Sequence, residues 1–416
     1  MIKRYSLLLC AWLVMVVCSH KPLLGQSKDF VLPRGLWVSN VGSDVFQSYR
    51  NMLSAIYAAK QLGVDSLFPV IWNKQDFFFN SKTVIQRLSP SYIRRTRYNE
   101  DVLEVMIQAA RDNNLKIYPS FESGLRVVLG SENSDYTTSI GQKFLDQDNW
   151  LSLDKYGNVY QECYFRVCFG FINILNPEVR DLLFSLVKDL ITSYDIDGLI
   201  FDDHFSLPRT TLGCDPSTDA YYDEESVYRN LLKSTQKITP LGIVKHLTDR
   251  LCDIDADQWR RQAITQFIAD SKALAERYGK KIILAPAGLP KWSQDEWLLD
   301  WEEMVRKDVV DGVIMQAFRS SSFSKMINNP YLKKLSREKP DVPIGVVILL
   351  GLRNDHYYAH GERVYRQTLE SLRSGREPSY YYHETVDLPV EGYSLEYRRE
   401  WIERTRRLLV TQPPSL

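Results

Sequence analysis

The sequence predicts an α/β chain folded as a single (β/α)8 barrel, with long insertions after its third and fourth strands. From residue 33 onward, short apolar segments alternate with longer segments that carry apolar residues at helical spacing. Eight such pairs are the count of a closed parallel barrel. The apolar segments are nearly continuous, as in parallel strands buried on both faces. An open doubly wound sheet is the alternative, but no glycine-rich dinucleotide turn follows the first strand.

Eight segments are expected to form the strands. In chain order they are residues 35–41, 66–72, 115–121, 197–203, 281–287, 311–318, 343–352 and 378–384. In a barrel of parallel strands, the carboxyl ends of all eight meet at one mouth.

Helical patterns occupy the connections between these strands, and several carry clear end signals. Residues 49–63 end at Gly63, a residue suited to a left-handed C-cap. In residues 176–194, Asn176 is placed to cap the helix and Pro177 to fill its first position. The remaining expected helices span residues 99–114, 257–280, 295–307 and 361–375.

Two connections are much longer than the others, roughly residues 123–175 and 205–256. Both follow the carboxyl ends of strands, where barrel enzymes build their functional face. Long connections in compact domains are usually functional. No internal repeat or second-domain boundary is visible, so residues 27–416 are expected to form one domain.

The first 26 residues are expected to be a signal peptide. Lys3 and Arg4 form a basic start, and the apolar stretch from Leu7 to Cys18 is too short to span a bilayer comfortably. A lipoprotein anchored through Cys18 is the alternative, although Val17 stands where lipoprotein processing requires a small side chain. The mature protein is therefore expected to be periplasmic, extracellular or at the cell surface, without a transmembrane segment.

Composition and cysteine usage narrow the partners and the metal chemistry. Lys plus Arg and Asp plus Glu both number 52, and this zero net charge argues against a nucleic-acid partner. Four cysteines remain after signal removal, which permits two local disulfides, Cys163–Cys168 and Cys214–Cys252, or free buried thiols. The chain has no CxxC pair, so a zinc site built from cysteine is not expected.

Polar side chains follow the predicted strands at the point where each strand ends, so one barrel mouth would gather them. They are Asn40, Asn73, Glu122, Asp202, Asp203, His204, Gln316, Arg319, Arg353 and Glu384. Carboxyl groups on different strands suit glycoside hydrolysis, which uses an acid and either a base or a nucleophile on the two sides of the bond. Aromatic residues between them, Trp37 and Trp72 among others, are expected to stack on sugar rings.

The chain also resembles the glycosyl hydrolase-like 10 family, which is also called domain of unknown function 187. The resemblance covers nearly the whole mature chain and is most specific around Asp202. It rests on RGLWVSNVGSDV, FPVIWN, YPSFESG, INILNPEVRDLL, YDIDGLIFDDHFSLP, CDPSTDAYY, QWRRQAITQFI, VDGVIMQAFR and GLRND in this order. It implies a TIM-barrel glycosidase, and some relatives act on the glycan strands of peptidoglycan. Departures at WNKQ, APAG and YHET leave the carboxyl groups intact but bear on sugar recognition.

Roles follow for the carboxyl residues at the mouth. Asp202 is the first candidate, because it resembles the strand-four aspartate that serves as nucleophile in many barrel glycosidases. Glu122 is the proposed acid/base, because an apolar setting beside Phe121 raises the pKa of a carboxyl group. Glu384 competes with Glu122 for this role.

The remaining polar residues at the mouth are assigned to orientation or binding. Asp203 and His204 are expected to orient Asp202 or to hold a sugar hydroxyl. Binding roles are assigned to Trp37, Asn40, Trp72, Asn73, Gln316, Arg319 and Arg353. Each of these residues has a purely structural alternative, such as a salt bridge or a core contact.

Two other functions remain open at this point. The Asp202–His204 segment together with His356 and His360, four apart on an expected helix, would suit the zinc site of a carbohydrate deacetylase. A carbohydrate-binding barrel without turnover is the other alternative. The hydrolase interpretation needs no metal or cofactor. The sequence has no GxSxG elbow, P-loop or HExxH motif.

Overall fold

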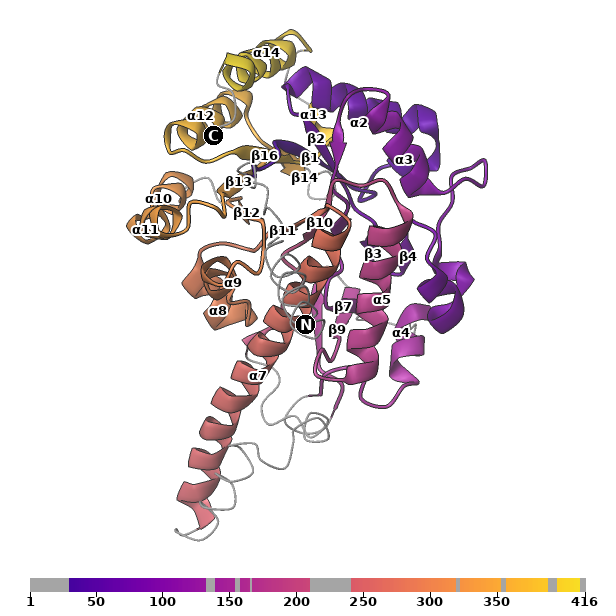
Figure 1. Cartoon of the computed structure of the whole chain (residues 1–416), viewed down its shortest axis with the longest axis vertical. Coiled ribbons are helices and arrows are strands. Elements are labelled where there is room, and N and C mark those ends of the chain that lie inside the picture. The colour runs from indigo at the N-terminus through magenta and orange to yellow at the C-terminus, as the bar shows by residue number, and fades with distance from the viewer. Residues whose placement is uncertain are drawn as a thin grey trace, which may run out of the picture.

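The computed structural model describes residues 30–131, 139–153, 158–164, 167–209, 241–318, 322–352, 357–387 and 395–411. Its main sheet is parallel throughout, with the strand order β5-β2-β1-β16-β13-β12-β11-β10-β6. The strands are β1 (Gly35–Val38), β2 (Ser66–Pro69), β5 (Lys116–Ile117), β6 (Ser120–Phe121), β10 (Gly198–Phe201), β11 (Lys281–Leu284), β12 (Gly312–Gln316), β13 (Ile344–Leu349) and β16 (Pro378–Tyr381). All eight predicted strand segments are therefore present, and the predicted (β/α)8 barrel is confirmed (Figure 1).

The sheet closes through its third strand, which is interrupted at Pro119. The first piece, β5, pairs with β2, and the second piece, β6, pairs with β10. Pro119 has no N–H to donate, so the ladder cannot run unbroken through this position. Its carbonyl still accepts a hydrogen bond from the amide of Ile200 (2.8 Å). The two ends of the sheet therefore meet on one strand, and the barrel has no open edge.

Helices cover the outside of the barrel. They are α2 (Tyr49–Leu62), α3 (Val102–Arg111), α5 (Pro177–Ser193), α7 (Leu241–Arg277), α8 (Pro290–Trp297), α9 (Trp301–Arg306), α10 (Phe323–Ile327), α11 (Pro330–Glu338), α12 (Gly361–Arg373), α13 (Glu384–Asp387) and α14 (Leu395–Thr411). Gly63 caps α2 in the left-handed region, with φ 78°. Asn176 caps α5 by accepting from the amides of Glu178 and Val179. Both predicted end signals are confirmed.

The expected helix at residues 295–307 is divided in two. Leu298 adopts a left-handed conformation with φ 49° at the end of α8, and Asp300 then caps α9 by accepting from the amide of Glu303 (3.1 Å). Leu298 is fully buried, so packing of its side chain in the core accompanies the break. Helix α7 begins well before the expected residue 257 and extends beyond the barrel in Figure 1.

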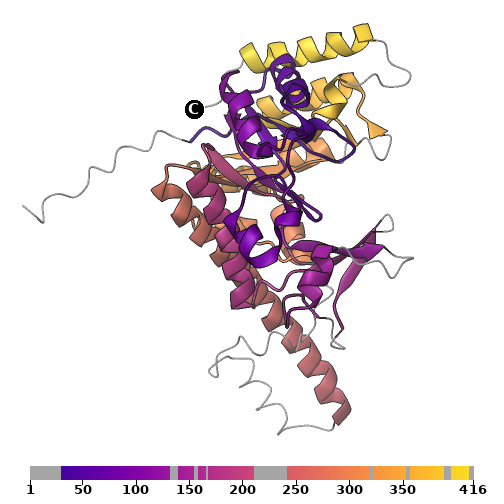
Figure 2. The same ribbon diagram turned by 90° about the vertical axis from the view of Figure 1, so that its right-hand side faces the viewer.

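The first long insertion forms a small antiparallel sheet at the barrel mouth, which Figure 2 shows standing out from the body of the molecule. Its strands are β7 (Arg126–Ser131), β8 (Gln161–Tyr164) and β9 (Val167–Phe171), accompanied by helix α4 (Ser139–Leu145). A disulfide joins Cys163 and Cys168, which face each other across β8 and β9. This confirms the first expected cysteine pair, whereas Cys214 lies outside the described residues.

Other sequence predictions fall outside the described residues. These are the signal peptide, most of the second insertion, Arg319, Arg353 and His356. Within the described part, no helix is long and apolar enough to cross a membrane.

Candidate active site

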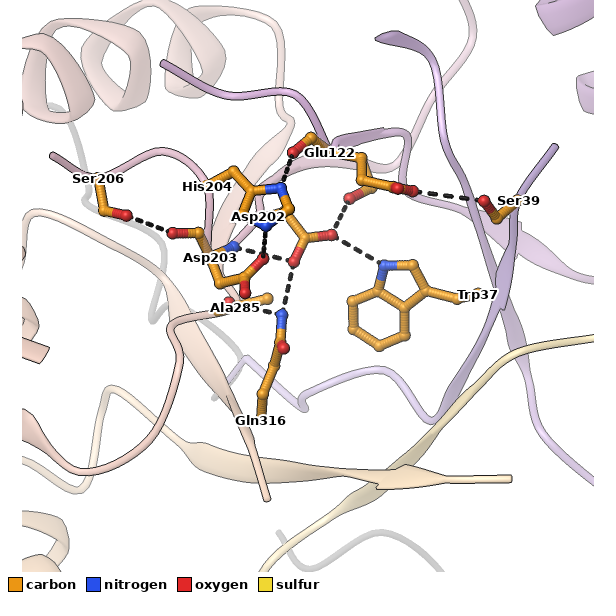
Figure 3. Close-up of polar contacts among 10 residues, drawn as sticks. Trp37, Ser39, Glu122, Asp202, Asp203, His204, Ser206, Ala285 and Gln316 are labelled. Carbon is orange, nitrogen blue, oxygen red and sulfur yellow. Dashed lines mark hydrogen bonds and ion pairs between the residues drawn. The ribbon is translucent and has the colours of Figure 1, made fainter. Parts of the chain in front are cut away.

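Asp202 lies at the centre of the barrel mouth and accepts four hydrogen bonds (Figure 3). Its Oδ2 atom accepts from Trp37 Nε1 (3.1 Å) and Ser120 Oγ (2.8 Å). Its Oδ1 atom accepts from Gln316 Nε2 (2.7 Å) and the amide of Asp203 (2.9 Å). Only 4% of the Asp202 residue surface is exposed to solvent. Each oxygen therefore has two donors, and the carboxylate is held in one orientation.

The barrel itself brings these donors together. Asp202 follows the fully buried strand β10, while Trp37, Ser120 and Gln316 come from β1, β6 and β12. These strands are far apart in sequence but end at the same mouth. The position of Asp202 is thus set by closure of the sheet.

Glu122 directly follows β6, the strand that pairs with β10. Its Oε2 atom accepts from Ser39 Oγ (3.3 Å), and the side chain is half-buried. Burial and the nearby Asp203 carboxylate raise the pKa of Glu122 from 4.5 to about 7, against the lowering effect of Ser39. A carboxyl group with this pKa holds a proton in about half of the molecules at neutral pH, as a general acid/base requires.

His204 connects Glu122 to Asp203. Its Nδ1 atom lies 2.8 Å from the backbone oxygen of Glu122, which can only accept, so Nδ1 carries the proton. The other ring nitrogen, Nε2, lies 3.7 Å from Asp203 Oδ1. The imidazole therefore links the segment after β6 to the segment after β10 through Glu122 and Asp203, and its role in orienting Asp202 or holding a sugar hydroxyl stays a prediction.

The two aspartates differ in their surroundings. Burial, followed by the charge of Asp203, raises the pKa of Asp202, while Ser120 and the Asp203 amide lower it. Burial also raises the pKa of Asp203, and the charge of Arg126 opposes this shift. The Asp203 side chain is 24% exposed, so it faces the mouth more openly than Asp202. The donors around Asp202 oppose the effect of burial on its pKa, and the two carboxyl groups titrate as a coupled pair.

The structure changes the expected role of both tryptophans. Trp37 and Trp72 are each 1% exposed, so their ring faces are not available for sugar stacking. Trp37 instead donates to Asp202, and Trp72 stacks on Phe77 with ring centroids 4.9 Å apart. Trp37 packs with Phe68 and Ile200 inside the barrel, where side chains fill the inward-facing positions, whereas Trp72 belongs to the larger core cluster outside it.

Of the remaining predicted residues, the structure describes Asn40, Asn73 and Glu384. Asn40 and Asn73 meet through a 2.8 Å hydrogen bond, as neighbouring strand ends would. Glu384 begins α13 and lies 3.5 Å from His383 Nε2. Arg319 and Arg353 lie outside the described residues.

The segment that leads to His360 is not the expected helix. Residues Tyr357–Tyr358 form strand β15, which pairs with β14 (Gly351–Leu352), and His360 caps α12 by accepting from the amide of Glu362. The i,i+4 spacing predicted for a zinc site therefore does not apply to His360. In the described part of the chain, no three His, Cys, Asp or Glu side chains converge as metal ligands.

Sequence reasoning missed four residues that shape the site. Ser39 and Ser120 supply hydroxyl donors, and no motif distinguishes them from other serines. Arg126 lowers the pKa of both Glu122 and Asp203. The fourth residue is Tyr381, at the end of β16. Burial is the main cause that raises the pKa of its hydroxyl, and the charges of Glu122 and Asp202 add to this shift. The position of Tyr381 at the end of the last strand was the one sequence feature that could have indicated its place in the site.

A family model for glycosyl hydrolase-like 10 proteins matches residues 33–360, more than half of the chain. The protein belongs to the glycosyl hydrolase-like 10 family. No curated protein matches the sequence of this family member.

Two solved structures share the fold of this glycosyl hydrolase-like 10 protein. The PgaB (BpsB) glycoside hydrolase domain from Bordetella bronchiseptica is 13% identical, with a TM-score of 0.56 over 84% of this chain and 94% of that one. Alpha-L-fucosidase isoenzyme 2 from Paenibacillus thiaminolyticus is also 13% identical, with a TM-score of 0.54 over 90% of this chain. The matched region is 49% of the fucosidase chain. At these identities the likeness shows a common barrel fold.

Proposed function

We propose that this protein is a glycoside hydrolase that cleaves O-glycosidic bonds of a polysaccharide with Glu122 and Asp202. The observation that carries the proposal is the pairing of a half-buried carboxyl group of pKa about 7 with a donor-rich carboxylate on the adjacent strand. Two carboxyl groups in unlike environments are the arrangement that glycosidases use. Family membership supports the same class of reaction.

In this mechanism Glu122 gives its proton to the glycosidic oxygen as the bond to the anomeric carbon breaks. The negative charge of Asp202 stabilises the positive charge that develops on the sugar ring. A water molecule then gives its oxygen to the anomeric carbon and a proton to Glu122. Trp37, Ser120 and Gln316 act through Asp202 by holding its oxygens in place.

Peptidoglycan glycan strands are the substrate class that we propose, on the basis of the family resemblance. Export by a signal peptide at residues 1–26 would place the enzyme beside this polymer. The Cys163–Cys168 disulfide supports export, because disulfides persist in oxidising compartments.

Product release from a glycan panel tests the proposal. Purified residues 27–416 are incubated with peptidoglycan strands stripped of peptides and with other polysaccharides, with and without a chelator. New reducing ends that are insensitive to chelator, and that are lost in Glu122→Gln, are the expected result. The anomer formed first, read by NMR, distinguishes attack by a carboxylate from attack by water. Acetate release that the chelator stops would instead establish a deacetylase, and binding without product would establish a carbohydrate-binding barrel.

The pH profile tests Glu122 as the proton donor. The donor must be protonated, so kcat/KM is expected to fall as pH rises through about 7. Ser39→Ala removes a hydrogen bond that lowers this pKa and should move the alkaline limb to higher pH. Asp203→Asn removes a charge that raises it and should move the limb to lower pH. Limbs that stay in place, or that move in the same direction, would remove Glu122 from this role.

A further inference from the structure

Beside the carboxyl groups, the barrel mouth carries a cation among aromatic rings. The Arg126 guanidinium carbon lies 5.7 Å from the ring centroid of Phe169 and 5.8 Å from that of Trp297, both within cation–π range. Trp292 continues this row, with its ring 6.5 Å from Trp297 and 45% of its surface exposed. Unlike the buried Trp37, these rings lie at least partly open to solvent.

Backbone hydrogen bonds connect both Arg126 and Trp297 to the segment that follows the two aspartates. The amide of Leu125 donates to the backbone oxygen of His204 (2.8 Å), and the amide of Leu207 donates to that of Trp297 (3.0 Å). Between Glu122 and Arg126 the chain turns at Gly124, with φ +56°. A Cβ there would lie 2.2 Å from the His204 carbonyl carbon, so only glycine permits this close approach. The backbone therefore sets the position of Arg126 relative to Asp203.

Electrostatics agrees with this placement. The charge of Arg126 lowers the pKa of both Glu122 and Asp203, so its guanidinium lies within electrostatic reach of the proposed reacting groups. A sugar bound across these carboxyl groups would extend along the row toward Trp297. Aromatic rings offer apolar faces to sugar rings, and a guanidinium recognises a carboxylate with two parallel hydrogen bonds.

We propose that Arg126, with Phe169, Trp297 and Trp292, forms a subsite that selects glycans carrying a carboxylate on a sugar next to the cleaved bond. This inference rests on the proposed function and adds its specificity: Arg126 reads the anionic substituent, and the tryptophans hold the sugar rings. An adjacent cluster of two aspartates and one glutamate would repel such a substrate, so a fixed cation at this point makes an anionic glycan acceptable.

Binding to a matched pair of glycans tests the subsite. The probes are peptide-stripped peptidoglycan strands, which carry lactyl carboxylates, and the same strands with these carboxylates converted to methyl amides. Affinity is measured by calorimetry in the Glu122→Gln background, so that cleavage does not consume the probe. Tighter binding of the carboxylate form is expected. Arg126→Met should reduce that preference about tenfold, whereas Trp292→Ala should weaken both forms about equally.

Two further variants make the result specific. Arg126→Lys keeps the charge without the planar fork, so it should retain part of the preference. Arg337→Met, on the exposed face of α11, makes the same change in net charge and should leave the preference intact. An equal loss for both glycans in Arg126→Met, or no preference in the parent, would overturn the subsite. A preference that depends on Arg126 in a protein that releases no product would refute the hydrolase and leave the subsite standing.

Discussion

Asp202→Asn is expected to lower kcat/KM on the cleaved glycan by about 10³-fold or more while the barrel remains folded. The substitution keeps the size of the side chain but removes the negative charge that faces the sugar in the proposed mechanism. It also turns an amide N–H₂ toward one of the two donor pairs, either Trp37 Nε1 with Ser120 Oγ or Gln316 Nε2 with the Asp203 amide. Initial rates with reducing-end detection measure the loss, and thermal melting measures the fold.

A matched control separates charge at the site from charge elsewhere. Asp181→Asn makes the same chemical change on α5, where the carboxylate is 70% exposed, and should leave the rate unchanged. Trp37→Phe and Ser120→Ala each remove a single donor to Asp202 and should reduce the rate about 10- to 100-fold, since a hydrogen bond to a charged group contributes about 1.5–3 kcal/mol. If Asp202→Asn keeps a tenth of the activity, Asp202 does not stabilise the charge on the sugar ring, and Asp203 becomes the candidate for that role.

Arg34→Met is expected to lower the free energy of unfolding by about 3–5 kcal/mol without altering the candidate active site. Arg34 precedes β1 and Glu377 precedes β16, so their 2.5 Å ion pair joins the first and last strands at the end opposite the mouth. Arg34 Nη1 also donates to the backbone oxygen of Leu409 in α14 (2.7 Å). Because both charged side chains are under 9% exposed, removing Arg34 takes away the cation that offsets the buried charge of Glu377.

Urea denaturation measures this effect, with two comparisons built into the chain. Arg87→Met breaks the ion pair with Asp181, whose side chains are 31% and 70% exposed, and should cost less than about 1 kcal/mol. The double variant Arg34→Met with Glu377→Met removes both buried charges together and should recover much of the loss. A loss in Arg34→Met no larger than in Arg87→Met would show that this pair does not hold the barrel closed.

Local sequence patterns predicted most of the strands and several of the helix ends. The apolar runs predicted the strands because a parallel barrel strand is buried on both faces, as β10 and β13 are throughout their length. Gly63 and Asn176 marked helix ends because capping depends on a single residue and its neighbours. The break at Leu298 escaped prediction, since its left-handed backbone goes with burial in the core and not with a glycine or proline signal.

For the candidate site, the sequence by itself determined which carboxyl groups stand at strand ends, and the barrel places Glu122 and Asp202 on adjacent strands accordingly. Only the tertiary structure decided their surroundings. Ser39, Ser120 and Trp37 reach the carboxyl groups because the sheet closes on itself, and nothing local separates a tryptophan that donates to Asp202 from one that packs on Phe77. A strand end specifies where a side chain starts; its partners, its burial and hence its pKa depend on contacts between segments far apart in the chain.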